Sequence, residues 1–383
     1  MKTKLKYQAI NWVDGMKLTA NHFATSDFHM KDTVRDASSI ALNSFNYGLL
    51  PPLEGMEDSI KLNVKNHANS HFEIVLESCN AITANGTRLI YVPELYHEEH
   101  PRLSVPASSM EENTRNSFFV VVNINSFKRI PIGTPDPEEV PLRHPNSYPE
   151  ISLKLMPRAQ INPNYIGAFQ FLLGELIWEN SSFIWDDNYI PPCTTMFGHS
   201  KLLGFLDQTM QKLNQLKNYC ITIIRNNSFG RPNNNKLAEN TCSICMVILN
   251  YISDYMFEFR HVSKEQAPIF FVNNISVLAN RISTAMIKIP DNEKEILLQY
   301  YHEWENVRPV DFESVLGEII EINYMHSDIA LSLQSIKKFL DTILLLWGKL
   351  SQLEYIGQRK DNIVVRSIEQ AGVENSKRWS LLD

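Results

Sequence analysis

The chain has 383 residues, of which 44% are apolar, and its formal net charge is −7. That length and apolar content allow two domains with sizeable cores. The acidic balance, with no basic block longer than two residues, argues against binding to nucleic acid or to an anionic membrane surface.

No segment has the features of a signal peptide or a membrane span. The lysines at positions 2, 4 and 6 are not followed by an apolar h-region. The longest apolar run, Phe339–Trp347, is interrupted by Asp341 and is too short for a bilayer. Five scattered cysteines, an odd number, suit reduced thiols. We therefore expect a cytoplasmic chain with no direct membrane insertion.

A first motif lies near the N-terminus, in the segment Asn11–Phe23. Gly15 permits a positive φ and hence a sharp turn, around which several apolar side chains gather. A helix is expected over Asp27–Leu42. The motif is either a packed corner with Trp12 and Phe23 in the core, or a surface that binds a partner. The partner-binding candidates are Trp12, Gly15, Met16, Leu18, His22 and Phe23.

The next region, Ser59–Phe171, is rich in predicted strands. Alternation over residues 60–65 and 151–155 is typical of half-buried strands, and 118–124 is a continuous apolar run. Asn85–Gly86 predicts a hairpin turn. Pro131–Pro149 is interpreted as a long surface loop. Short strands separated by turn signals favour an antiparallel sandwich.

A second motif, Phe183–Cys193, closes this region. Strands are predicted over Leu172–Trp178 and Phe183–Tyr189, with a turn at 179–181 between them. Pro191 and Pro192 fix φ and remove two N–H donors, which ends strand pairing. We interpret this double proline as a domain boundary.

Helical periodicity replaces the strand pattern after Gly198. Helices are predicted to follow that glycine and Pro268, and to span Leu237–Phe259, Asn292–Trp304 and a last long segment that reaches Leu350. The first and last carry apolar residues at alternating spacings of four and three, the pattern of a coiled-coil seam, which favours a bundle paired within or between chains. The oligomerisation candidates are Leu206, Leu213, Leu216, Ile336, Leu340, Ile343 and Trp347.

No combination of residues predicts catalysis, a metal site or a cofactor. Cys242 and Cys245 have redox-motif spacing but lie in an apolar helical run without further ligands. His97–His100 lies between prolines rather than on a metalloprotease helix, and His22 lacks a ligand set. There is no phosphate-binding loop or nucleophile elbow. The pair Asp186–Asp187 is interpreted as non-catalytic. The chain is not expected to be an enzyme.

The two motifs resemble signatures of the TssK family, the trimeric baseplate subunit of bacterial type VI secretion systems. In that family a Trp precedes an acidic-Gly-Met-x-Leu segment and a later His-Phe, as in Trp12–Phe23 here. An acidic, aromatic run that ends in Ile-Pro-Pro closes the first domain, as in Phe183–Pro192. Order and spacing agree across about half the chain.

The resemblance implies an α+β fold, in which a β-sandwich shoulder similar to phage receptor-binding proteins sits on a helical neck. The expected division is a shoulder over residues 1–192, a neck over 193–357 and a C-terminal tail over 358–383. It also implies a homotrimer that binds the baseplate subunits TssF and TssG and lies at the inner membrane through the secretion apparatus.

The end of the chain departs from the family. Only about 30 residues follow the last long helix, too few for the family's head domain, which binds TssL and TssM. The membrane-complex partner is therefore left unidentified. We expect the tail to dock through Trp379, Leu381 and Leu382, either on a partner or a neighbouring protomer, or on the neck of its own chain.

A rival interpretation is a phage or phage-derived receptor-binding or tail-fibre adaptor protein, which shares the same architecture. Such proteins tend to carry trimeric β-structure at the distal end, whereas this chain ends in helix and tail. That difference favours the secretion baseplate.

Overall fold

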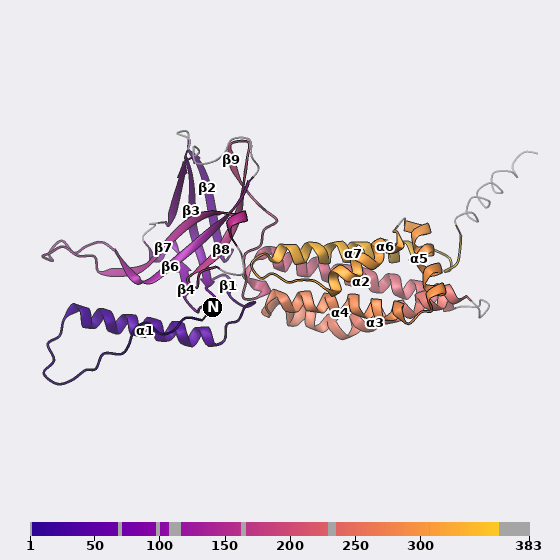
Figure 1. The fold of residues 1–383 in the computed structure, drawn as a ribbon, viewed down its shortest axis with the longest axis horizontal. Helices are drawn as coiled ribbons and strands as arrows, with labels where there is room; N and C mark the ends of the chain where they lie inside the picture. The colour runs from indigo at the N-terminus through magenta and orange to yellow at the C-terminus, as the bar shows by residue number, and fades with distance from the viewer. Residues whose placement is uncertain are drawn as a thin grey trace, which may run out of the picture. The chain divides into compact units, whose positions relative to one another are not determined.

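The computed structural model describes residues 2–67, 71–96, 100–106, 116–161, 166–228, 235–305 and 307–359. The chain divides into two compact units. Unit 1 comprises residues 1–207, 259–272 and 323–334, and unit 2 comprises 208–258, 273–322 and 335–383. Figure 1 labels the elements of both. The predicted α+β class is confirmed, whereas the expected division at residues 192 and 357 stays a prediction.

Unit 1 contains an antiparallel sheet built around one long strand. Strand β3 (His71–Ile82) pairs with β1 (Gly48–Leu49), β2 (Ile60–His67), β4 (Arg88–Tyr91) and β5 (Arg102–Pro106). The predicted hairpin joins β3 to β4, with Ala81 opposite Leu89 and Gly86 at φ +91°. Glycine suits this position because an L side chain rarely adopts that φ.

A second antiparallel sheet in unit 1 has the order β7-β6-β8-β9. The strands are β6 (Asn116–Ile132), β7 (Asn146–Pro157), β8 (Gln170–Glu179) and β9 (Ser182–Trp185). The ring of Phe72 in β3 packs edge-on against Trp178 and Phe183, at centroid distances of 5.3 and 5.2 Å. These contacts join the two sheets in one core, as expected of a sandwich.

Two predicted boundaries in this region are wrong. The expected loop 131–149 is shorter, because Ile132 of β6 pairs with Asn146 of β7. Strand β8 pairs with β6 only as far as Asn123, so the far end of β6 has an open edge that tolerates proline. The strand expected to reach Tyr189 ends at Trp185, where the Tyr189 N–H donates to the Asp186 carbonyl and forms a turn.

The double proline is held within unit 1. The Leu49 N–H donates to the Pro192 carbonyl at 2.7 Å, and Leu49 forms a bridge with Cys193. A Cβ on Gly48 would lie 2.1 Å from the Pro192 oxygen, so only glycine fits beside this segment. The residues after the prolines therefore continue the packing of the first sheet.

The helices of the second half follow the predicted pattern closely. They are α2 (Ser200–Ser228), α3 (Lys236–His261), α4 (Pro268–Ile287), α5 (Asp291–Glu305), α6 (Pro309–Ile320) and α7 (Ile329–Ser351). Sequence analysis did not predict α6, which begins at Pro309, a residue pre-set for the first turn of a helix. Within the described residues, no helix combines the length and apolar character needed to cross a membrane.

Aromatic side chains fill the core of unit 2 around Trp347. Its ring stacks against Phe312 at a centroid distance of 6.5 Å and contacts Tyr301 at 5.9 Å. The indole N–H donates to the Cys245 sulfur at 3.3 Å. Trp347 is fully buried and its one polar group is hydrogen bonded.

Candidate functional site: the N-terminal arm and helix α1

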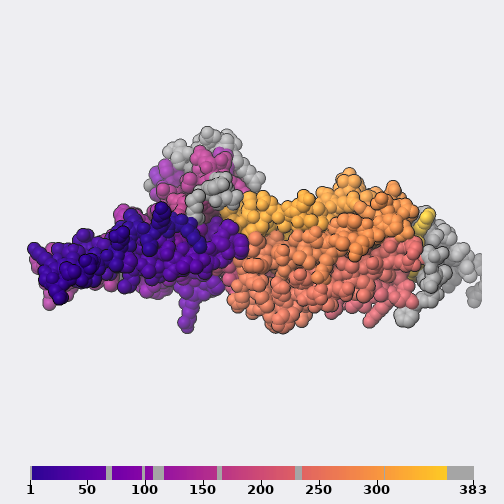
Figure 2. All heavy atoms as spheres, turned by 60° about the horizontal axis from the view of Figure 1, so that its bottom comes forward, coloured from indigo at the N-terminus to yellow at the C-terminus, as the bar shows by residue number. Residues whose placement is uncertain are grey.

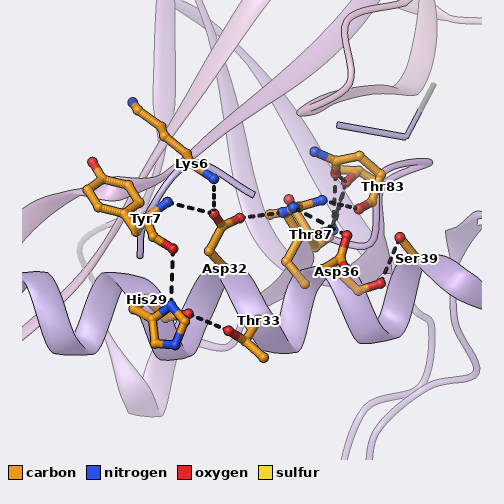
Figure 3. Close-up of polar contacts among 11 residues, drawn as sticks. Lys6, Tyr7, His29, Asp32, Thr33, Asp36, Ser39, Thr83 and Thr87 are labelled. Carbon is orange, nitrogen blue, oxygen red and sulfur yellow. Dashed lines mark hydrogen bonds and ion pairs between the residues drawn. The ribbon is translucent and has the colours of Figure 1, made fainter. Parts of the chain in front are cut away.

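The N-terminal arm (residues 2–19) is attached to helix α1 (Ala20–Ile40) by polar contacts. The backbone N–H groups of Lys6 and Tyr7 both donate to one carboxylate oxygen of Asp32. In return, the His29 imidazole Nδ1 donates to the Tyr7 carbonyl at 3.0 Å (Figure 3). These contacts satisfy backbone groups of a segment that has no regular structure of its own.

The same carboxylate links α1 to the first sheet. Arg35 Nε donates to the other oxygen of Asp32 at 2.8 Å, and Arg35 Nη1 donates to the Asn85 carbonyl at 3.2 Å. Both side chains are buried. Although burial opposes ionisation, the hydrogen bonds from Lys6 and Arg35 lower the pKa of Asp32. Asp32 therefore stays ionised and holds the arm, the helix and the β3–β4 turn together.

The fit between α1 and the β3–β4 turn is close. A Cβ built on Gly86 would lie 2.3 Å from the Arg35 carbonyl oxygen and 2.8 Å from the Ser39 nitrogen. The turn itself is held by Thr83, whose hydroxyl accepts from the Thr87 N–H at 3.1 Å (Figure 3). Gly86 thus serves both the turn and the approach of the helix.

Aromatic rings connect the arm and α1 to the second sheet. Tyr7 contacts Phe28 and Phe127 at centroid distances of 5.1 and 4.7 Å. Phe127 lies where the β6–β7 register shifts. Arg129 pairs with Asp27 at 2.6 Å and lies over the Phe28 ring. Helix α1 is therefore fixed to both sheets of unit 1.

The predicted turn is present at the tip of the arm. Gly15 has φ +77°, and the Met16 N–H donates to the Val13 carbonyl at 3.3 Å. The Thr19 N–H donates to His22 Nδ1 at 3.3 Å, a reciprocal contact of the capping-box type. This cap explains why α1 begins at Ala20, earlier than the predicted Asp27.

The apolar side chains of this motif lie on the surface of the chain. Trp12 is 49% exposed, Leu18 57% and Phe23 58%, while Met16 and His22 are half-buried. Trp12 contacts Phe23 and His22 at centroid distances of 6.4 and 6.2 Å. The structure therefore brings Trp12, His22 and Phe23 together, but not as the core that one of the two interpretations required.

Helix α1 buries polar residues and exposes apolar ones. Its buried residues are Asp32, Arg35 and Ser39. Met30 is 67% exposed and Val34 is 61% exposed. At 3.6 residues per turn these two lie on the opposite side of the helix from Asp32. In Figure 2 the indigo atoms of the arm and α1 form an open face of unit 1. Sequence analysis missed Met30 and Val34, although their spacing from Phe23 was visible.

The oligomerisation candidates lie in the chain's own core. All seven are between 0 and 3% exposed within one chain. Their role in oligomerisation stays a prediction. The tail-docking candidates Trp379, Leu381 and Leu382, and residues 97–99, lie outside the described residues.

The remaining candidates form no recognisable chemical site. Burial raises the pKa of the half-buried Cys242 thiol to about 11, so it is protonated at neutral pH. Asp187 is 95% exposed. It lines a cavity of about 310 Å³ with Asp186 and Glu175, and the Glu175 carboxylate is engaged by Arg158. In the described part of the chain, no group of three or more His, Cys, Asp or Glu side chains could hold a metal ion.

Comparisons with known proteins identify the fold. No protein-family model and no curated protein matches the chain. A crystal structure of TssK matches 90% of this chain and 69% of its own, at 14% identity and a TM-score of 0.51. A chain of the baseplate complex from the type VI secretion system matches over 90% of this chain and 99% of its own, at 12% identity and a TM-score of 0.51. The resemblance to TssK is thus confirmed at the level of the fold.

Proposed function

We propose that this chain is a structural subunit of the baseplate of a type VI secretion system and not an enzyme. The observation that carries this proposal is the similarity of 90% of the chain to TssK and to a chain of that baseplate. In this role the chain is an adaptor that links TssF and TssG to the membrane-anchoring complex, as the family resemblance implies.

We assign partner binding to the tip of the arm. Three large apolar side chains that one chain leaves exposed, Trp12, Leu18 and Phe23, support this assignment. Aromatic anchors of this kind contribute much of the binding energy when they fill a pocket on a partner. The arm is also held on both sides of its tip, by Asp32 at Lys6 and Tyr7 and by the Thr19–His22 cap, which limits the conformational freedom that it loses on binding.

Co-expression with the TssF and TssG proteins of the same secretion system tests this role. Trp12→Ala with Leu18→Ala should reduce co-purification at least about tenfold, because two anchors are lost, and should leave the melting temperature within a few degrees. Ile287→Ala is a matched control, since Ile287 is 74% exposed on α4. Failure of the unmodified chain to co-purify with either protein contradicts the proposed function.

We also propose that the protein is a homotrimer whose contacts include the helices of the neck. The seam residues are enclosed, so these contacts would involve exposed apolar side chains such as Val310, which is 74% exposed, and Leu345, which is 54% exposed. Light scattering over a dilution series measures the mass directly. A stable monomer at micromolar concentration contradicts the trimer.

A further inference from the structure

The exposed side of α1 has the residue spacing of a helix-packing seam. Phe23, Met30, Val34, Ala37 and Ala41 are all exposed, and with Asp27 they recur at alternating intervals of four and three. This is the spacing by which one α-helix packs along another. A partner that docked as a loop or a strand would not require apolar residues at these intervals along nearly the whole of α1.

The middle of the seam is exposed at Met30 and Val34, whereas its first part meets its own chain, since Phe23 contacts Trp12 and Asp27 pairs with Arg129. The opposite side of α1 makes the contacts with the arm and with the β3–β4 turn, through Asp32 and Arg35. A helix attached by its polar side gains nothing from apolar residues on its solvent side. Several large apolar side chains exposed along one side of a helix are typical of a protein interaction site.

The side chains at the two ends of the seam differ in size. At the N-terminal end Trp12 lies beside Phe23 and adds a second large ring. At the other end Ala37 and Ala41 are small, so a partner helix can approach the backbone closely there. The seam therefore favours a helix that carries small residues at one end and large residues at the other.

Charge indicates the chemistry of the partner. Residues 2–41 contain six cationic and four acidic side chains, in a chain whose net charge is −7. Asp27 and Asp32 are paired with Arg129 and Arg35, and Asp36 lies 3.8 Å from Arg35, which leaves Asp14 as the other acidic group. Lys2, Lys17 and Lys31 are all exposed. Lys31 follows Met30 on α1, Lys17 follows the turn at Gly15, and Lys2 Nζ donates to the Ile40 carbonyl at 3.4 Å.

We propose that the seam of α1 is the docking surface for an acidic amphipathic helix of a partner protein. The apolar side of that helix packs on Phe23, Met30 and Val34, and its flanking carboxylates face Lys17 and Lys31. Opposite charges around an apolar contact favour one partner and one orientation. This inference rests on the proposed function, because it identifies the kind of segment that a baseplate partner presents to the N-terminal region.

Two synthetic peptides of about 20 residues test the proposal, a length at which a helix can form. They share leucines at intervals of four and three and differ only in their flanking residues, which are Glu in one and Lys in the other. By fluorescence anisotropy at low salt, the full chain should bind the Glu peptide at least about tenfold more tightly. Added salt should weaken that preference.

Variants of the full chain locate the binding surface. Met30→Glu with Val34→Glu should abolish binding of both peptides, and Lys17→Glu with Lys31→Glu should reverse the charge preference. Ile287→Glu on α4 is the control and should change neither. Equal affinity for the two peptides, absence of binding, or binding unaffected by the Met30 and Val34 substitutions overturns the proposal.

Two further measurements separate this inference from its alternatives. If the chain self-associates and Met30→Glu with Val34→Glu removes that association, the seam binds a second copy and the proposal is wrong. If TssF and TssG co-purify with the chain but the same double variant has no effect on them, the baseplate role stands and the docking surface fails. If the unmodified chain does not co-purify with TssF and TssG, the proposed baseplate role is wrong, whether or not the peptides bind.

Discussion

Helices α1 and α7 carry the same apolar spacing and use it in opposite ways. In α7 the seam residues, such as Ile336 and Trp347, are fully buried. In α1 the corresponding positions, such as Met30 and Val34, are mostly exposed. The spacing therefore predicts that a helix packs, but not what it packs against. What decides is the other side of the helix, which in α1 carries Asp32 and Arg35.

The largest expected effect is in the bundle. Trp347→Ala should lower the free energy of unfolding by about 3–5 kcal/mol, because a buried ring and its contacts with Tyr301 and Phe312 are lost. Chemical denaturation measures the change. Trp12→Ala is the matched substitution on the arm and should cost far less. Equal losses for the two tryptophans would show that the arm belongs to the core and would break the comparison.

A smaller effect is expected where α1 meets the β3–β4 turn. Gly86→Ala should cost about 2 kcal/mol or more, since it combines an unfavourable φ with a Cβ 2.3 Å from the Arg35 carbonyl. Gly55→Ala is the control, because Gly55 has φ +84° and nothing within 4 Å of its Cβ. It should show only the backbone cost, of about 1 kcal/mol. Similar losses of stability at Gly86 and Gly55 would mean that α1 shifts to make room for the added Cβ.

Sequence analysis predicted the elements whose stability is local or periodic. Helices α2 and α7 were found from their seams, and the β3–β4 hairpin from Asn85–Gly86. The start of α1 was placed late because its cap uses His22 where a capping box usually has Glu or Gln.

The attachment of α1 to the rest of unit 1 could not be predicted from the sequence, for a physical reason. Arg35 and Asn85 are 50 positions apart, and Asp32 binds backbone groups of the arm that any residue would supply. Polar residues at 32, 35 and 39 look like a solvated side of a helix until the turn that covers them is known. Trp12, His22 and Phe23 lie in contact, whereas the role of the predicted residues in partner binding stays a prediction and Met30 and Val34 were overlooked.

The polar attachment of α1 should respond to pH. Asp32→Asn should cost about 1–3 kcal/mol, because the arm and Arg35 lose a charged acceptor. The pKa of Asp32 is lowered below the ordinary value of 3.8. Its contribution is therefore complete above that pH and is lost as the pH falls through the folded-state pKa. Denaturation in acid should show a smaller loss of stability in Asp32→Asn than in the unmodified chain, because the other carboxylates titrate in both, whereas an equal loss in the two proteins contradicts the prediction.

The smallest effect on stability should come from the seam of α1 itself. Met30→Ser with Val34→Ser removes apolar groups that water already reaches, so the free energy of unfolding should change by no more than about 0.5 kcal/mol. Ile336→Ser with Leu340→Ser makes the equivalent change in α7, where each buried side chain leaves a cavity and an unpaired hydroxyl. Denaturant titration of the two double variants compares the loss in free energy of unfolding when the same kind of substitution is made in a seam that supports the fold and in one that does not. A large loss in the α1 variant would mean that α1 packs inside the protein's own assembly, whereas a small loss leaves its apolar residues to a partner.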